Sequence, residues 1–233
     1  MTPQTNIFKR SVFALLAAAF LVSASHAQNL VPNSGFEEVN FDYCGLVPTT
    51  KKFEDATKYW LVPTDARPNI YSKALDSSCW NYLRIDAKSG KRAAIVLIYA
   101  RKNFRSYLQI PLKESLKKGK VYYTEIFVRV GKESQYAANN IGLYFSDTLV
   151  REKRRDNLNF EPQVNHNEIL KDTSNWISIK GKFKATSNAK YLLIGNFFNK
   201  EHTKVERIRY NYNADPETVF YFVDDVFVSE EME

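Results

Sequence analysis

Cysteine and histidine are scarce in this sequence of 233 residues, which contains two cysteines and three histidines. Apart from one histidine near the N-terminus, only His166 and His202 occur. They lie far in sequence from both cysteines and show no zinc-ligand spacing. A zinc centre is therefore not expected.

Motifs that mark common catalytic sites are also missing. The sequence has no Gly-x-Ser-x-Gly elbow, no His-Glu-x-x-His helix and no glycine-rich phosphate loop. Ser34 precedes Gly35, but no histidine partner for it can be identified. No pair of carboxylates stands out as a glycosidase site. We therefore expect a protein that is not an enzyme.

Long apolar runs are absent after the N-terminal segment. There, Lys9 and Arg10 precede an apolar run over residues 12–22, and small residues follow. This is the layout of a secretory signal peptide, and the run is shorter than the roughly 20 residues of a membrane-spanning helix. We expect residues 1–27 to be a signal peptide and residues 28–233 to be one exported domain with no membrane span.

The charge balance is mildly basic. Lys and Arg number 33 against 26 Asp and Glu, a net charge of +7, and loss of Lys9 and Arg10 with the signal peptide leaves +5. The densest basic run contains Arg151, Lys153, Arg154 and Arg155, and we expect it to be a solvated loop. Basic and aromatic residues do not interleave repeatedly, so nucleic-acid binding is not expected.

The two cysteines, Cys44 and Cys79, both lie in the mature part. An isolated pair in an oxidising compartment usually forms a disulfide. We predict that Cys44 and Cys79 are bonded. Two buried thiols are the alternative, because sequence alone does not give the geometry.

Segments rich in β-branched and aromatic residues recur along the chain, with turn-type residues between them. The expected strands cover residues 79–86, 93–99, 106–112, 121–130, 141–146, 176–183, 190–197 and 219–228. In the strand 121–130, Tyr122, Thr124, Ile126, Val128 and Val130 share one face. Residues 114–118 could form one helical turn that ends at Gly119. The pattern predicts an all-β sandwich.

Four segments carry a resemblance to a known family. They are NLVPNSGFEE, LKKGKVYYTEIFVRV, WISIKGKFKATSNAKYLLIGNFF and YFVDDVFV, in this order. Together they resemble galactose-binding-like carbohydrate modules, in particular the exported module of Bacteroidetes envelope proteins that often precedes an OmpA-like domain. The resemblance implies a jelly-roll β-sandwich whose opening strand is the first segment, with Trp176 and Phe183 in the core.

The resemblance also implies a structural calcium ion between the first and last strands. The matching acidic positions are Glu37 in GFEE and Asp224 in YFVDDV. Calcium takes six to eight oxygens, from carboxylates and backbone carbonyls. Glu38 and Asp225 should point to the opposite faces and rank second. The alternative is that these acids simply end strands at a solvated edge.

A sugar-binding surface needs exposed aromatic rings with polar groups beside them. Candidates in the first half are Trp60, Tyr71, Trp80, Tyr82, Tyr99, Phe104 and Tyr107. In the polar segment 199–218 they are Arg207, Arg209, Tyr210 and Tyr212. Most aromatic residues of a sandwich are core, but Trp80, Tyr210 and Tyr212 have polar neighbours. We predict ligand binding by Trp80, Tyr82, Arg207, Arg209, Tyr210 and Tyr212.

Two functions fit these patterns. The first is a non-catalytic module that binds a polysaccharide or envelope glycan. The second is an envelope protein that contacts other envelope proteins, which would show a broad apolar patch or an exposed edge strand. In either case we expect the protein to be periplasmic, outer-membrane-associated or extracellular.

Overall fold

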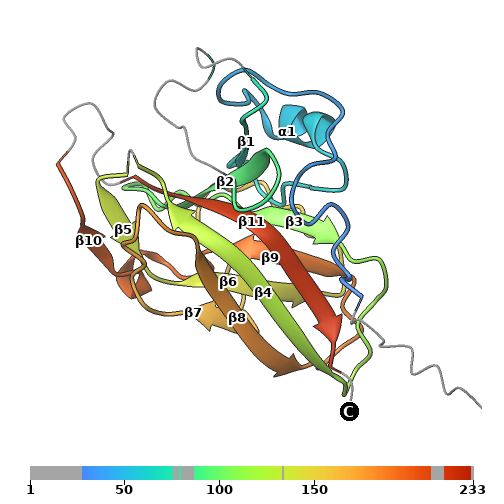
Figure 1. The fold of residues 1–233 in the computed structure, drawn as a ribbon. Helices are drawn as coiled ribbons and strands as arrows, with labels where there is room; N and C mark the ends of the chain where they lie inside the picture. Colours follow the sequence, from blue (N-terminus) through green and yellow to red (C-terminus); the bar gives the residue numbers. More distant parts are fainter. Residues whose placement is uncertain (1–27, 76–78, 80–86, 133, 211–217, 232–233) are drawn as a thin grey trace, which may run out of the picture.

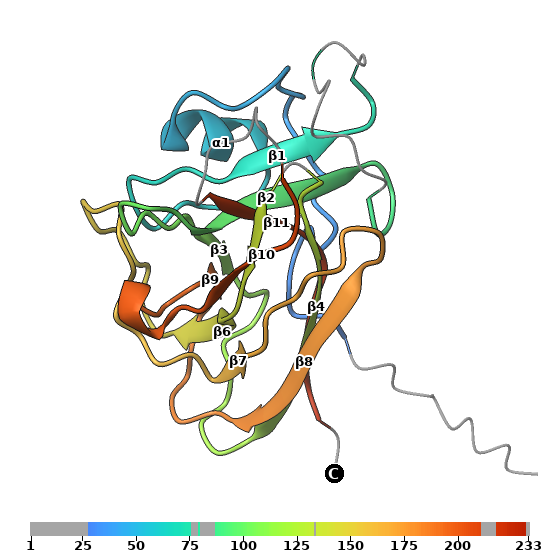
Figure 2. The same ribbon diagram turned by 90° about the vertical axis from the view of Figure 1, so that its left-hand side faces the viewer.

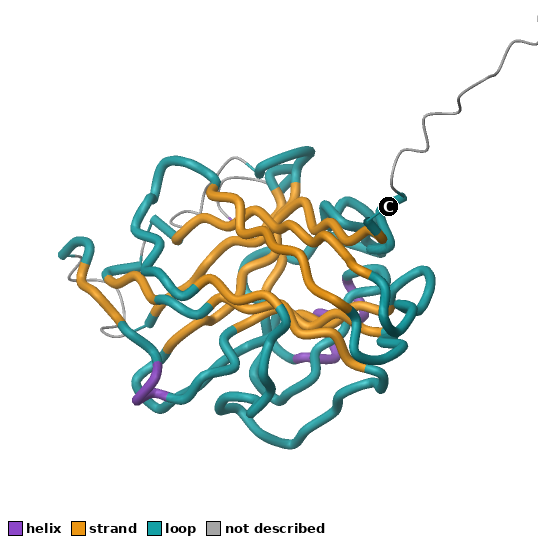
Figure 3. The backbone as a smooth tube through the Cα atoms, turned by 90° about the horizontal axis from the view of Figure 1, so that it is seen from below, coloured by secondary structure: helices purple, strands orange, loops and turns teal. Residues whose placement is uncertain are grey.

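The computed structural model describes residues 28–75, 79, 87–132, 134–210 and 218–231. The predicted signal peptide, residues 1–27, lies outside this part of the chain. Strands and loops make up nearly all of the described chain (Figure 3). Helix is confined to short pieces, among them α1 (Thr50–Ala56) and the 3-10 helix η2 (Lys200–His202).

The larger sheet holds five antiparallel strands (Figure 1). Their spatial order is β1 (Asn69–Ser72), β2 (Arg92–Tyr99), β11 (Val219–Glu230), β4 (Val121–Val130) and β8 (Ile177–Lys184). The last strand of the chain therefore lies in the middle of this sheet. Backbone hydrogen bonds from Leu30 to Val228 (2.8 Å) and from Val226 to Ser34 (3.0 Å) tie the N-terminal segment to β11.

A second sheet of four strands packs against the first (Figure 2). Its order is β3 (Leu108–Pro111), β9 (Tyr191–Gly195), β6 (Ile141–Ser146) and β7 (Val164–His166). A separate two-stranded ribbon pairs β10 (Val205–Arg207) with β5 (Tyr136–Ala138). Two facing antiparallel sheets confirm the predicted all-β sandwich.

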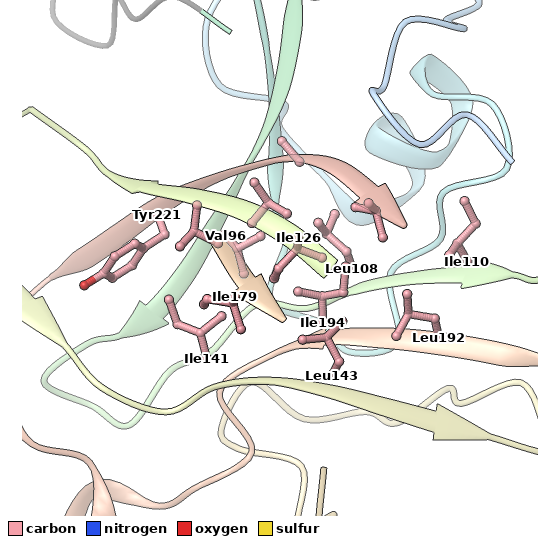
Figure 4. Close-up of a cluster of buried hydrophobic side chains, with 14 of the residues drawn as sticks. Val96, Leu108, Ile110, Ile126, Ile141, Leu143, Ile179, Leu192, Ile194 and Tyr221 are labelled. Carbon is pink, nitrogen blue, oxygen red and sulfur yellow. The ribbon is translucent and has the colours of Figure 1, made fainter. Parts of the chain in front are cut away.

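The core lies between the two sheets, where apolar side chains from both meet (Figure 4). Ile126 and Val128 of β4 and Ile179 of β8 come from the first sheet, whereas Leu192 and Ile194 of β9 come from the second. Along β4, every second residue from Tyr122 to Val130 is buried, as the alternation predicts.

Most expected strands are present, but the opening segment is different. NLVPNSGFEE forms a turn instead of a strand, with positive φ at Asn33 and Phe36. Residues 114–118 form no helix, although Gly119 does adopt the positive φ of a turn. The short strands β1, β5, β7 and β10 were not predicted, because three or four residues give too little periodicity to detect. The expected strand 79–86 falls almost entirely outside the described residues.

The outer face of the four-stranded sheet is covered by the segment between β6 and β7. Gln109 of β3 is buried and exchanges two hydrogen bonds with the backbone of Val150, at 2.9 and 3.2 Å. Val150 and Leu158 join Tyr107, Leu193 and Phe197 in a second apolar cluster. This face therefore packs against its own chain.

Cys44 and Cys79 form a disulfide, as predicted. The bond spans 35 residues of sequence and links the segment before α1 to the segment after β1 (Figure 1). A disulfide of this kind fits an oxidising compartment. Within the described residues, no helix is both long and apolar enough to cross a membrane.

Reduction of this bond should lower the free energy of unfolding by roughly 3 to 4 kcal/mol, because it returns loop entropy to the unfolded chain. Urea denaturation with and without reductant measures the difference. A double variant, Cys44→Ser with Cys79→Ser, should be less stable and insensitive to reductant. An unchanged wild-type midpoint after complete reduction would contradict the prediction.

Candidate functional site

The β5–β10 ribbon places Arg207 beside two tyrosines. Arg207 pairs with Tyr136 in the ribbon register, and its Nε donates to the Tyr136 hydroxyl at 3.1 Å. The guanidinium carbon lies 5.1 Å from the Tyr136 ring centroid and 4.7 Å from that of Tyr210. Such distances are typical of cation–π contacts. Hydrogen bonds to Tyr136 and Tyr210 also raise the pKa of Arg207, so its charge is permanent.

Backbone contacts hold the chain after Arg207 on the ribbon. The N–H groups of Ile208 and Arg209 both donate to the carbonyl of Gln135, at 2.8 and 3.3 Å. The Arg209 side chain donates to the Lys132 carbonyl. Tyr210 follows directly and is 76% exposed, the largest exposed fraction among the large hydrophobic side chains of the described chain. A fixed backbone therefore presents an accessible aromatic ring.

Of the six predicted ligand-binding residues, the structure brings Arg207 and Tyr210 together. Arg209 is anchored to the same ribbon by the Lys132 carbonyl. Trp80, Tyr82 and Tyr212 lie outside the described residues. Tyr136 was missed, because it belongs to the cluster only through strand pairing between segments 71 residues apart.

Four other aromatic candidates from the first half of the chain are core residues. Trp60 and Tyr107 are fully buried, and Tyr71 and Tyr99 are nearly so. Their hydroxyl or ring nitrogen groups can be satisfied internally, as in the 2.5 Å hydrogen bond from the Tyr107 hydroxyl to the Asn196 carbonyl. These four candidates therefore have the core role that the sequence favoured for most aromatic residues, since a buried ring offers no face to a ligand.

A buried carboxylate lies on β11, where the strand bulges. Asp224 is fully buried, and its Oδ2 accepts from the backbone N–H groups of Lys88 and Ser89 at 2.9 and 3.2 Å. The register with β4 shifts between Asp224 and Phe227, and Asp225 has φ of 48°. Burial raises the pKa of Asp224 to about 7 in spite of these donors.

We expected Asp224 and Asp225 to face opposite sides of the strand, and this prediction was wrong because of the bulge. Ser89 donates its N–H to Asp224 and its hydroxyl to Asp225 Oδ1, at 2.6 Å. Both carboxylates therefore reach the same serine. The extra residue of a bulge breaks the two-residue alternation on which the expectation depended.

Glu37 lies against the same segment of chain. Its Oε1 accepts from the N–H groups of Lys91 and Arg92, both at 2.7 Å, and the Arg92 guanidinium bonds Oε2 at 3.2 Å. Gly90 makes this approach possible, because it has φ of 60° and a Cβ there would lie 2.5 Å from Glu37 Oε1. Arg92 also pairs with Asp42 at 2.7 Å, and that hydrogen bond lowers the pKa of Asp42.

Both predicted calcium ligands thus contact the segment 88–92, which is one requirement of a shared ion. Among the described residues, however, no group of three or more His, Cys, Asp or Glu side chains is placed to hold a metal. An ion between Glu37 and Asp224 would take its remaining oxygens from carbonyls and water. Calcium at these residues stays a prediction.

Comparison with known proteins gives structural neighbours only. No protein-family model and no curated protein matches the sequence. The CBM22-1 xylan-binding domain from Paenibacillus barcinonensis is 14% identical, with a TM-score of 0.44 over 89% of this chain and 97% of that one. The xylanase CBM22-1 and GH10 modules of Clostridium thermocellum, complexed with xylohexaose, are 14% identical to this chain. Their TM-score is 0.46, over 89% of this chain and 29% of that one.

A cyclase from Fischerella sp. TAU scores similarly, with 15% identity and a TM-score of 0.45 over 86% of this chain and 96% of that one. Similarity at this level does not assign a function, which depends on the site residues instead.

Proposed function

We propose that this protein is an exported, non-catalytic module that binds a polysaccharide or envelope glycan. The binding surface would be Arg207 and Tyr210 at the end of the β5–β10 ribbon, called the Tyr210 ribbon below. The observation that carries the proposal is the 76% exposure of Tyr210 beside Arg207. The disulfide and the predicted signal peptide support export.

The arrangement suits a sugar ring chemically. An exposed tyrosine offers a flat face to the C–H groups of a pyranose, and a guanidinium supplies several hydrogen-bond donors for hydroxyl oxygens. The contact with Tyr136 limits the motion of Arg207, so less side-chain entropy is lost on binding. Arg209 adds a second guanidinium close to Tyr210, and ligand binding by Trp80, Tyr82 and Tyr212 stays a prediction from the sequence.

A variant with Tyr210→Ala and Tyr212→Ala should lose glycan retention without unfolding. Tyr210 is exposed, so its removal should change the free energy of unfolding by less than about 0.5 kcal/mol. A glycan array and pull-down on insoluble polysaccharides measure the retention. Tyr59→Ala is the matched control, since Tyr59 is also an exposed tyrosine, at 51%.

Equal retention by the double variant and the wild type would contradict the Tyr210 proposal. Release of reducing sugar would contradict the non-catalytic assignment. Capture of an envelope protein with no glycan binding would favour the interaction protein that the sequence left as the second function. Strand pairing at the β8 edge is disfavoured for such a partner, because Lys180, Lys182 and Lys184 are exposed there.

A further inference from the structure

We propose that two basic loops, residues 101–105 and 151–157, form a binding site for an acidic polysaccharide. The inference deepens the proposed glycan-binding function by naming a charge class of ligand, and it uses a surface different from the Tyr210 ribbon. Its cationic residues are Arg101, Lys102, Arg105, Arg151, Lys153, Arg154 and Arg155.

The fold joins the two loops, which are about 50 residues apart in sequence. The Arg105 N–H donates to the Arg155 carbonyl at 2.8 Å. Asn103, with φ of 60°, donates from its side chain to Asn157 at 2.9 Å. The Arg155 guanidinium carbon lies 4.4 Å from the Phe104 ring centroid. Backbone, amide and ring contacts therefore hold the two sets of charges side by side.

Acidic residues neutralise only part of this charge. Arg154 pairs with Asp156 at 2.8 Å and with Glu152 at 3.5 Å, and Arg151 pairs with Glu54. In the part of the chain that the structure describes, no ion pair is formed by the other exposed cations, which are Arg101, Lys102, Lys153 and Arg155. These side chains leave an excess of positive charge on the loops.

Arg105, the last residue of the first loop, adds a buried positive charge. Its side chain is fully buried, and its Nε has no hydrogen-bond acceptor among the described residues. The other contacts are neutral: the Phe104 carbonyl at 2.9 Å, the Thr203 hydroxyl at 3.5 Å and the Tyr99 ring at 4.9 Å. Burial lowers the pKa of Arg105 to about 10, which still leaves it charged at neutral pH.

A buried charge without a carboxylate partner is costly. An anion bound over the loops would offset this cost, since electrostatic interactions strengthen where water is excluded. Arginine forks fit the planar carboxylate of a uronic acid and the oxygens of a sulfate ester equally well. The shared ligand chemistry is therefore an anionic oxygen group on a sugar chain.

Nucleic acid is the other common polyanion, and two observations disfavour it. Single-stranded nucleic acid needs several aromatic rings for base stacking, whereas the loops carry one ring, Phe104. The disulfide also fits an oxidising compartment and is a feature rare in cytosolic and nuclear proteins, which are the proteins that meet most nucleic acid.

The test measures binding of the protein to polygalacturonate, sulfated dextran, neutral xylan and a DNA duplex. A triple variant removes three exposed charges by Lys102→Gln, Lys153→Gln and Arg155→Gln. We expect its affinity for an acidic polysaccharide to fall about tenfold or more. Wild-type binding should weaken with salt.

The control variant removes the same charge elsewhere, by Lys180→Gln, Lys184→Gln and Lys190→Gln, and should bind like the wild type. If the triple variant is unstable, Lys102→Gln with Lys153→Gln leaves the Phe104 contact intact and should still weaken binding. Binding to polygalacturonate alone would identify carboxylate as the ligand group, and binding to sulfated dextran alone would identify sulfate.

Equal losses in the triple variant and the control would overturn the proposal, because net charge would then explain the binding. Preference for DNA, or no binding to either acidic polysaccharide, would also overturn it. The proposed Tyr210 function fails separately, since it is tested by retention of any glycan in the Tyr210→Ala, Tyr212→Ala variant.

Discussion

Trp60→Ala should lower the free energy of unfolding by about 3–5 kcal/mol, a large part of the roughly 5–15 kcal/mol that stabilises an ordinary protein. Trp60 is fully buried, and its ring stacks on Phe36 with centroids 4.5 Å apart. Its Nε1 also donates to the Asn33 carbonyl at 3.0 Å. The substitution removes a large apolar volume, leaves a cavity and takes away one of the two N–H donors to that carbonyl, the other being the Phe36 N–H at 3.1 Å.

Trp176→Ala is the comparison that tests this reasoning. The resemblance to carbohydrate modules implied that Trp176 lies in the core, but it is half-buried and packs on a small outer cluster with Tyr71 and Phe222. Its removal should cost about 1–2 kcal/mol. Urea denaturation of both variants measures the two losses. A Trp176→Ala loss equal to or larger than that of Trp60→Ala would contradict the assignment of core and outer cluster.

The longer strands of this fold were predictable because each carries its own signal, whereas β1, β5, β7 and β10 are too short to carry one. Alternation in residues 121–130 and the apolar runs at 141–146 and 190–197 appear as β4, β6 and β9. The prediction of a strand in the opening segment was wrong, because Asn33 and Phe36 adopt a left-handed backbone conformation. Asparagine tolerates that conformation, but phenylalanine gives no such sign in the sequence.

The site residues were less predictable, because each cluster depends on contacts between distant segments. Tyr136 meets Arg207 only when β5 pairs with β10. Arg105 meets the second basic loop only through the Arg155 carbonyl. The basic run 151–155 was visible in the sequence, and we expected it to be a solvated loop. The sequence did not show that a second basic segment, residues 101–105, would lie beside it.

Burial of Asp224 should make the metal-free protein less stable as pH rises from about 4 to 7. Its pKa is about 7 in the folded state, above the value of about 3.9 for an exposed aspartate. At low pH the carboxyl is protonated in both states. As pH rises, the unfolded chain loses the proton first, so stability falls across this window and then levels off.

The free energy of unfolding should fall by at most about 4 kcal/mol across this window, since each unit of difference in pKa between the folded and unfolded states is worth about 1.4 kcal/mol. Asp224→Asn should remove this pH dependence. It should also lower the free energy of unfolding at every pH, because the NH2 group of the asparagine would face the backbone N–H of Lys88 or Asp225 and leave that donor without an acceptor. Comparing variant with wild type cancels the opposite trend of other carboxyls, such as Asp42, whose pKa is lowered. Asp225→Asn is the control and should retain most of the wild-type slope, because burial is the main cause of the raised pKa of Asp224 and the neighbouring Asp225 charge is a smaller one.

Denaturation from pH 4 to 8 in the presence of a chelator measures these slopes, and equal slopes for wild type and Asp224→Asn would contradict the raised pKa.

The second part of the test repeats these measurements with added calcium. An ion at Glu37 and Asp224 would hold Asp224 ionised, so added calcium should raise the melting temperature and flatten the wild-type slope. A melting temperature unaffected by calcium or chelator would leave Asp224 as a buried acid held by the N–H groups of Lys88 and Ser89.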